Sequence, residues 1–119
     1  MYNYFKRSRR SDRLKHGRIT RTGFAVYTEE NTMYDLHTHS RCSDGSESPE
    51  HVAELAKAAG IELLALTDHD CVRGVPAALS RAAQLELRML PGVEAEADYA
   101  DTLHILGIGQ DIDAPCFQK

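Results

Sequence analysis

The sequence has no tryptophan, only three cysteines and no apolar run long enough to span a membrane. The cysteines, at positions 42, 71 and 116, are odd in number and scattered, which argues against the disulfide framework of a small secreted domain. No apolar stretch of signal-peptide length opens the chain. The composition is that of a globular protein, and we expect reduced thiols, a cytoplasmic location and no membrane contact.

Basic residues are too few for a chain that coats nucleic acid along its whole length. Eighteen acidic and fourteen basic residues give a formal net charge of −4. The average conceals two segments. Residues 1–32 hold eight basic and three acidic residues, a net charge of +5, whereas residues 33–119 hold six basic and fifteen acidic residues, a net charge of −9. The composition therefore changes near Met33.

The basic segment, residues 1–32, has few large apolar residues and no helical or strand periodicity that would bury a face. We predict a basic arm without regular structure. Three interpretations remain open: sequence extraneous to the functional protein, an arm that makes weak contacts with nucleic-acid phosphates, or an organelle transit peptide.

The rest of the chain alternates between strand and helix patterns. Residues 33–38 predict a short strand, and residues 40–48 predict a polar loop. Ser48 is placed to cap a helix that begins at Pro49, and Gly60 is placed to end it. The apolar stripe of this helix is expected to contain four residues: Val52, Leu55, Ala56 and Ala59.

Three further strands and one further helix follow. Residues 61–67 form the nearly continuous apolar run of a strand covered on both faces, and residues 76–85 predict a helix. Residues 87–93, interrupted late by Pro91-Gly92, and residues 103–108 predict two more strands. Strands separated by one helix pair in parallel, so the predicted fold class is α/β, an open sheet or the start of a barrel. The last two strands have no helix between them and predict an antiparallel hairpin.

Candidate metal ligands stand at the ends of these strands. His37 and His39 are two apart on the first strand, so both imidazoles point the same way. Asp44 precedes Gly45, which permits the tight turn that folds a carboxylate over the strand end. His69 directly follows the second strand. Taken alone, each of these signals has a purely structural interpretation, such as a turn or a buried histidine.

Two more candidates come from the predicted hairpin. Glu94 follows the third strand, and a carboxylate can bridge two cations where an imidazole cannot. If the hairpin turns at residues 99–100, paired positions sum to about 199, which places His104 opposite Ala95 and beside Glu94. The six candidate ligands are His37, His39, Asp44, His69, Glu94 and His104. They converge on the edge where α/β folds build their sites.

The neighbours of His69 suggest supporting roles. Asp68 and Asp70 flank the imidazole and are expected to accept a hydrogen bond from it and so fix its tautomer, although Asp70 also suits a helix cap. Cys42 and Cys71 lie near the predicted site, and we interpret them as incidental thiols because oxygen and imidazole ligands already suffice.

Five motifs carry a resemblance to a known family. They are Asp35-Leu36-His37-Thr38-His39-Ser40, Ser43-Asp44-Gly45, Ala65-Leu66-Thr67-Asp68-His69-Asp70, Pro91-Gly92-Val93-Glu94 and His104-Ile105-Leu106-Gly107. Together they resemble the amino-terminal part of the PHP (polymerase and histidinol phosphatase) family over about residues 33–110. The resemblance implies a distorted seven-stranded β/α (TIM-like) barrel that holds up to three divalent ions, commonly Mn, Zn or Fe, and a metal-bound hydroxide as nucleophile.

The resemblance also implies a role for each ligand. His37 and His39 would hold the first metal, Glu94 would bridge the first and second, and His104 would bind the second. Asp44 and His69 would hold the third. The family draws further ligands from one later histidine and a final Asp-x-His, and this sequence has neither after His104. We therefore predict that residues 33–119 are a truncated, catalytically inactive amino-terminal part of such a domain.

The implied activity is hydrolysis of phosphate esters by the full-length protein. Among the branches of the family, the segment is most similar to enzymes that act on nucleoside 3′,5′-bisphosphates and on short oligonucleotides from the 5′ end. Histidinol-phosphate phosphatase and polymerase-associated exonuclease are alternatives within the enzyme class. A non-catalytic module that binds metal or nucleic acid is the alternative outside it.

Overall fold

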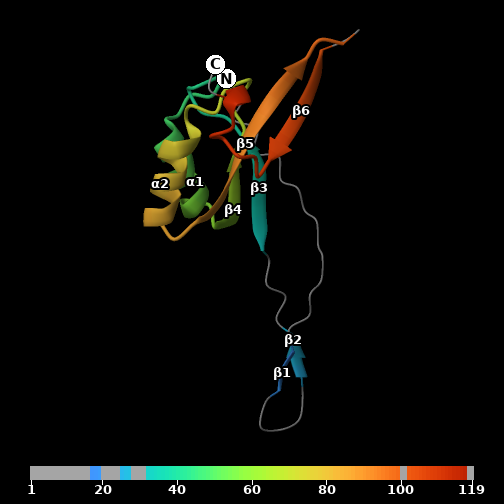
Figure 1. The fold of residues 1–119 in the computed structure, drawn as a ribbon. Coiled ribbons are helices and arrows are strands. Elements are labelled where there is room, and N and C mark those ends of the chain that lie inside the picture. The colour runs from blue at the N-terminus through green and yellow to red at the C-terminus, as the bar shows by residue number, and fades with distance from the viewer. Residues whose placement is uncertain (1–16, 20–24, 28–31, 100–101, 118–119) are drawn as a thin grey trace.

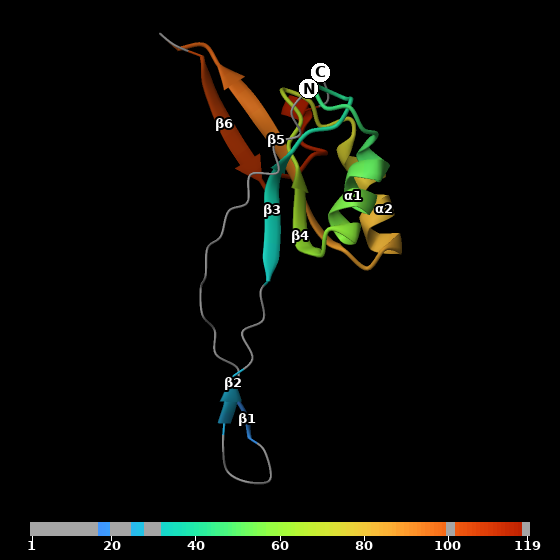
Figure 2. The ribbon, with the colours of Figure 1, turned by 180° about the vertical axis from the view of Figure 1, so that it is seen from behind.

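The computed structural model describes residues 17–19, 25–27, 32–99 and 102–117. They form an α/β fold with a four-stranded sheet, and both helices lie on one side of that sheet (Figures 1 and 2). The elements, in chain order, are β1 (Gly17–Ile19), β2 (Ala25–Tyr27), β3 (Met33–Thr38), α1 (Pro49–Ala58), β4 (Ile61–Leu66), α2 (Val75–Gln84), β5 (Arg88–Ala97), β6 (Leu103–Ile108) and the 3-10 turn η1 (Pro115–Phe117).

The sheet has the predicted topology. Its strand order is β3-β4-β5-β6, with β3, β4 and β5 parallel and β6 antiparallel to β5. The parallel strands bring their carboxyl ends to one edge, where the β3–α1 and β4–α2 loops also lie (Figure 1). The topology therefore delivers the residues that follow β3 and β4 to the same place.

The bounds of β3 and β6 match the prediction, whereas β5 is longer than predicted. It runs through Pro91-Gly92 to Ala97 without a break. Pro91 has no N–H to donate, but its carbonyl accepts a hydrogen bond from the Gly109 N–H at 2.7 Å. The proline is therefore accommodated inside the strand and does not end it.

Helix α1 begins as predicted, and its buried face agrees only in part with the predicted apolar stripe. The Ser48 side chain accepts a hydrogen bond from the His51 N–H at 3.2 Å, and Gly60 follows the helix with a φ of +78°. Leu55, expected in the apolar stripe, is 39% exposed, and Ala59 is also exposed. The buried positions are Pro49, Ala53 and Ala56. The predicted stripe is therefore right at Ala56 and at Val52, which packs against the core, and wrong at Leu55 and Ala59. Small alanines, rather than the larger leucine, meet the neighbouring elements.

An apolar layer fills the space between the helices and the sheet. We use this name for the buried residues Ala53, Ala56, Ile61, Leu64, Leu66, Val75, Ala78, Ala82 and Leu87. Its alanines carry short side chains, which let α1 and α2 lie close to β4 and to each other. The layer packs α1 and α2 against β4, the central parallel strand, beneath the edge that carries the candidate ligands.

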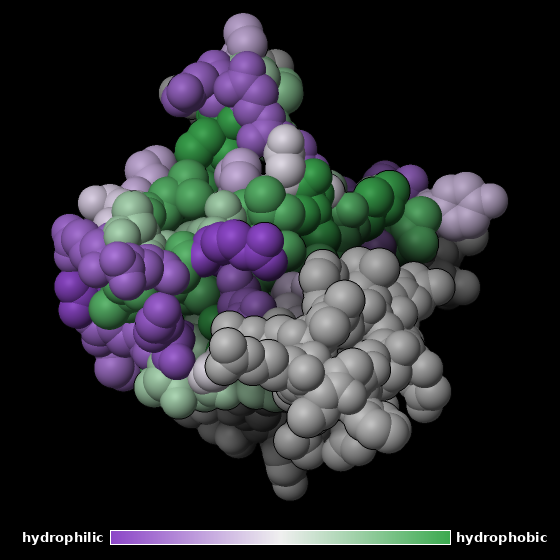
Figure 3. Space-filling model, turned by 90° about the horizontal axis from the view of Figure 1, so that it is seen from below, coloured by the Kyte–Doolittle hydropathy of each residue, from purple (hydrophilic) through white to green (hydrophobic). Residues whose placement is uncertain are grey.

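Strand β6 differs from the other strands of the sheet because its apolar side chains reach solvent. Leu103, Ile105, Leu106 and Ile108 are each more than a third exposed. In Figure 3, hydrophobic surface extends toward the side on which the β5–β6 hairpin projects in Figure 1. β6 is also an edge strand, with β5 as its only partner among the described strands.

The basic segment contributes two short elements for which we predicted no regular structure. β1 and β2 pair as an antiparallel hairpin of three residues each and form a sheet separate from β3–β6. The rest of that segment lies outside the described residues, so its contact with nucleic acid stays a prediction. Within the described parts of the chain, no helix has the length and apolar character needed to cross a membrane.

Candidate metal centre

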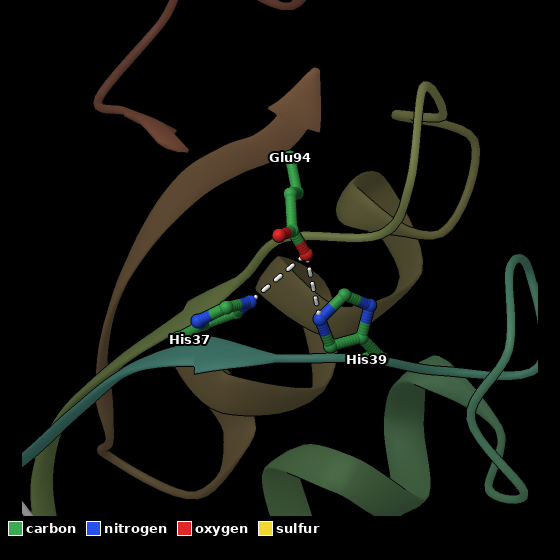
Figure 4. Close-up of side chains that lie close together, drawn as sticks. All are labelled: His37, His39 and Glu94. Carbon is green, nitrogen blue, oxygen red and sulfur yellow. Dashed lines mark hydrogen bonds and ion pairs between the residues drawn. The ribbon is translucent and has the colours of Figure 1, made fainter. Parts of the chain in front are cut away.

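Both histidines of β3 reach the same carboxylate. The Nε2 atoms of His37 and His39 lie 2.9 and 3.1 Å from Oε2 of Glu94 (Figure 4). The two ring centroids are 5.0 Å apart. The pairing of β3 with β4 is irregular between Asp35 and Thr38, just where the first histidine stands. The predicted common direction of the two imidazoles is thus observed.

Glu94 lies at the middle of the cluster. Its Oε1 lies 2.9 Å from Nδ1 of His104, and its Oε2 lies 3.6 Å from Nδ1 of His69, so four imidazoles surround one carboxylate. The residue is only 5% exposed. Burial alone raises the pKa of Glu94, but hydrogen bonds with His37 and His104 and the nearby histidines outweigh it and lower the pKa. Glu94 is therefore ionised at neutral pH.

Asp44 brings a second carboxylate to the other side of the cluster. Its Oδ1 lies 3.2 Å from Nδ1 of His39, and its Oδ2 lies 3.5 Å from Nε2 of His69. The loop doubles back at Gly45, where any Cβ would collide with the carbonyl group of His39. This close approach is the tight turn predicted from the sequence.

His104 reaches the cluster in a register one residue away from the predicted one. Paired positions in the β5–β6 hairpin sum to 200, so His104 lies opposite Glu96 and not Ala95. Side chains alternate along a strand, so His104, Glu96 and Glu94 share one face of the hairpin. The predicted register would have placed His104 on the face opposite Glu94.

The six predicted ligands form three overlapping groups. In each group, one ligand atom per residue lies within 4.8 Å of the others. The groups are His37, His39 and Glu94; His39, Asp44 and His69; and His69, Glu94 and His104. We call these six residues the histidine cluster.

The histidine cluster has the donor chemistry of a divalent-cation site. Burial lowers the pKa of His39; Asp44 and Glu94 oppose this effect, and His69 and His37 reinforce it. A neutral imidazole offers a lone pair to a metal, and an ionised carboxylate offers charge. The residues present therefore fit a divalent cation.

Asp68 and Asp70 hydrogen-bond to groups other than the imidazole of His69, which they were predicted to contact. Among the hydrogen bonds between described residues, neither carboxylate contacts the imidazole of His69. Asp68 is fully buried and accepts hydrogen bonds from the Ser40 N–H and hydroxyl, both at 2.6 Å, and from the Ser43 hydroxyl at 2.7 Å. Asp70 accepts from the Glu96 N–H at 2.9 Å. It does not cap α2 either, because Gly74 holds the N-cap position.

Sequence reasoning missed the two serines that hold the loop. Ser43 contacts Asp68 and also lies 3.4 Å from both Nδ1 of His39 and Oδ1 of Asp44. Asp68 is therefore linked through Ser43 to His39 and Asp44, two of the predicted ligands. The sequence did contain a signal for this contact. Asp68 comes just after an apolar strand, where a buried carboxylate needs hydrogen-bond donors, and Ser40 and Ser43 offer hydroxyl groups in the β3–α1 loop.

Asp35 is another buried polar residue for which the sequence predicted no role. It is 9% exposed, and burial raises the pKa of its carboxyl, an effect partly offset by the His37 N–H at 3.4 Å. Cys42 and Cys71 stay outside the three groups formed by the described residues, and both are free thiols. Neither thiol contributes to the histidine cluster.

Comparisons with known proteins agree with the geometry. The family described as the PHP domain matches residues 35–112. The chain is similar to a 3′,5′-nucleoside bisphosphate phosphatase of Chromobacterium violaceum, with 45% identity over 82 residues that cover 68% of this chain and 29% of the relative. It is also similar to the 5′-3′ exoribonuclease Rnm of Salmonella typhimurium, with 37% identity over 104 residues that cover 84% of this chain and 33% of the relative.

A solved structure shares the fold. An amidohydrolase from Chromobacterium violaceum, described with bound sulfate and no metal, matches with a TM-score of 0.69 and 43% identity. The match covers 71% of this chain and 30% of that one. The chain thus spans about 30% of the length of these relatives.

Proposed function

This chain belongs to the PHP domain family, and from that premise we propose that its histidine cluster is part of a divalent-metal site for hydrolysing phosphate esters. The substrates we infer are nucleoside 3′,5′-bisphosphates or short oligonucleotides degraded from the 5′ end. The names of the Chromobacterium and Salmonella relatives support this substrate class.

One observation carries the proposal: a buried carboxylate, Glu94, lies among four imidazoles. Such an arrangement is expensive unless cations or protons balance it, because a buried carboxylate requires compensation. His39 resists protonation, since burial lowers its pKa. A divalent ion is the partner that suits both the ionised Glu94 and the neutral His39.

We assign ligands to ions as the family resemblance implies. His37, His39 and Glu94 hold one ion, Glu94 and His104 contribute to a second, and Asp44 and His69 contribute to a third. The three overlapping groups support this assignment. When bound, divalent ions supply Lewis-acid chemistry, neutralising charge on phosphate oxygens and making water acidic enough to react near neutral pH.

The chain's own residues set up that chemistry. Glu94 contributes the negative charge that holds adjacent cations, and the backbone of β5 fixes its position. Asp44 is two-thirds exposed, so its carboxylate is accessible from solvent. Asp68 and Ser43 keep the Asp44 loop against His39, so that the ligand positions exist before a metal arrives.

We further propose that this chain corresponds to the amino-terminal part of a longer seven-stranded barrel. Its span of about 30% of the relatives and the exposed apolar side chains of β6 support the proposal. The later strands would cover β6 and supply the remaining ligands.

The three free cysteines support a cytoplasmic location.

A chimera tests the function. The 82 residues that match the Chromobacterium phosphatase replace the corresponding segment of that enzyme. We expect Mn²⁺-dependent release of phosphate from adenosine 3′,5′-bisphosphate, and a loss of roughly 100-fold or more in His69→Ala and Glu94→Ala chimeras. His51→Ala is the matched control, because His51 lies on α1 and pairs with Glu47 and Glu54.

The outcomes separate the alternatives. Full turnover by the Glu94→Ala chimera would contradict the proposed site. Metal binding without turnover in a folded chimera would favour the non-catalytic module. The 119-residue chain, assayed in parallel, is expected to be inactive, and turnover comparable with that of the chimera would refute the proposal that later ligands are needed.

A further inference from the structure

A cavity opens beside the histidine cluster. Its volume is about 360 Å³, and His69, Asp70, Cys71, Arg73 and Phe117 are among the residues that line it. His69 belongs both to this cavity and to two of the three ligand groups. A molecule that occupies the cavity therefore touches the histidine cluster directly.

Arg73 is the cation of this cavity. Its Nε–H donates to Sγ of Cys71 at 3.3 Å, and this is the one side-chain hydrogen bond of Arg73 among the described residues. The bond fixes the guanidinium through Nε and leaves its two terminal NH₂ groups free to donate to a ligand. These groups form a fork that matches two oxygens of one phosphate.

Other basic side chains of the described domain have protein acceptors or lie elsewhere. Arg81 pairs with Glu54 at 2.7 Å, Lys57 donates to the Glu86 carbonyl at 3.2 Å, and Arg88 donates to the Glu62 carbonyl at 3.5 Å. Arg41, like Arg73, has no carboxylate partner among the described residues, but it does not line the cavity. Arg73 thus combines an unpaired charge with a position beside the cluster.

The remaining walls suit a nucleotide. Phe117 in η1 provides an aromatic surface on which a nucleoside can pack. Asp70 contributes a carboxylate, but its Oδ1 is engaged by the Glu96 N–H. Asp70 and Arg73 carry opposite charges, so the net charge of the cavity wall is small. An anion is therefore recognised through directed hydrogen bonds from the guanidinium and not through the overall charge of the cavity.

We propose that Arg73 is a specificity-determining residue that binds a second phosphate of the substrate while the histidine cluster engages the first. The inference rests on the proposed function and deepens it: the site prefers substrates with two phosphates over those with one. A site that donates hydrogen bonds to a substrate group discriminates against an analogue that lacks the group, because its donors are then left unpaired.

The test compares two ligands on the full 119-residue chain loaded with Mn²⁺. Isothermal titration calorimetry measures the Kd of adenosine 3′,5′-bisphosphate and of adenosine 5′-monophosphate for four proteins: wild type, Arg73→Ala, Arg73→Lys and Arg88→Ala. The Arg88 variant is the matched control, since it removes one arginine at the opposite end of β5 from the site. Circular dichroism checks that all four are folded alike.

We expect Arg73→Ala to weaken bisphosphate binding by roughly 10- to 100-fold, the range for hydrogen bonds to a charged group, and monophosphate binding by less than about threefold. Arg73→Lys should recover part of the loss, and Arg88→Ala should match wild type. An equal loss for both ligands, no loss for either, or a similar loss in Arg88→Ala would overturn the inference. If wild type binds neither ligand in the presence of Mn²⁺, the proposed function is refuted as well. This result differs from failure of the Arg73 inference alone, in which wild type still binds the ligands.

Discussion

The apolar layer and the histidine cluster are neighbours along the chain but obey opposite rules. β4 places Leu64 and Leu66 in the layer, and His69, three residues after Leu66, lies in the cluster. The layer excludes polar groups and stabilises the fold by burial. The cluster buries a carboxylate among imidazoles, which costs stability in the absence of a cation. The difference indicates that the apolar layer serves folding and the histidine cluster serves metal binding. Substitutions in the two regions should therefore affect stability and metal affinity differently.

The largest effect on stability is expected from the apolar layer. Leu64 is fully buried, so Leu64→Ala should lower the free energy of unfolding by about 2–5 kcal/mol through lost burial and a residual cavity. Urea denaturation measures the change, with exposed Glu62→Ala on the same strand as the control. Equal stability of the two variants would contradict the assignment of the layer as the core.

Asp68 is buried like the apolar layer, but it contacts Ser40 and Ser43 in the loop that carries Asp44. Its substitution should therefore have an intermediate effect on stability. Asp68→Asn places an amide group among the three donors of Ser40 and Ser43, and we expect a loss of about 1–3 kcal/mol in the free energy of unfolding. The variant should also bind Mn²⁺ more weakly, because Ser43 no longer holds Asp44 and His39. Exposed Asp98→Asn is the control. Unchanged metal affinity in a destabilised Asp68→Asn would show that Asp68 acts on the fold alone.

The cap of α1 belongs to the folding region and should leave metal binding intact. Ser48→Ala removes the acceptor for the His51 N–H, with an expected loss of about 1 kcal/mol. Thermal denaturation followed by circular dichroism measures it, and Ser46→Ala in the exposed loop is the control. A clear loss of Mn²⁺ affinity in Ser48→Ala would contradict the independence of the folding region and the histidine cluster.

The smallest effect is a dependence of stability on pH. His39 has a lowered pKa in the folded state, so the unfolded chain binds its proton more readily. In metal-free buffer, the free energy of unfolding should therefore fall as the pH drops through 6.5, the ordinary pKa of histidine, toward the lower folded pKa. Asp35, whose pKa is raised, acts with the opposite sign as the pH rises.

The measurement compares the free energy of unfolding of wild type with that of His39→Gln at each pH between about 5 and 8. Asp35 is present in both proteins, so its contribution cancels in the comparison. This range lies above the unfolded pKa of glutamate. The slope should be smaller in His39→Gln. Identical slopes would mean that His39 titrates normally.

The sequence was sufficient where a single local rule decides the structure. Periodicity predicted the bounds of β3 and β6, and Ser48 with Pro49 predicted the start of α1. The six candidate ligands could be chosen because they lie in or just after the predicted strands, and the sheet topology brings these positions together at one edge. These features depend on neighbours in the chain.

Features that depend on distant partners were not predictable. The face that α1 buries is set by α2 and β4, so Ala53 replaced Leu55 in the core. The continuation of β5 through Pro91 depends on Gly109. The hairpin register was wrong by one residue, because the position of the turn alone does not fix the pairing. The roles of Asp68 and Asp70 depended on donors in the β3–α1 loop and in β5.

The most direct test of the histidine cluster is metal content. Wild type, Glu94→Ala and His51→Ala are incubated with Mn²⁺, passed through gel filtration and analysed for bound metal by elemental analysis. We expect wild type and His51→Ala to retain metal and Glu94→Ala to lose most of it, because Glu94 contacts four imidazoles. Equal metal in the three proteins, all folded, would contradict the assignment of the cluster as a metal centre.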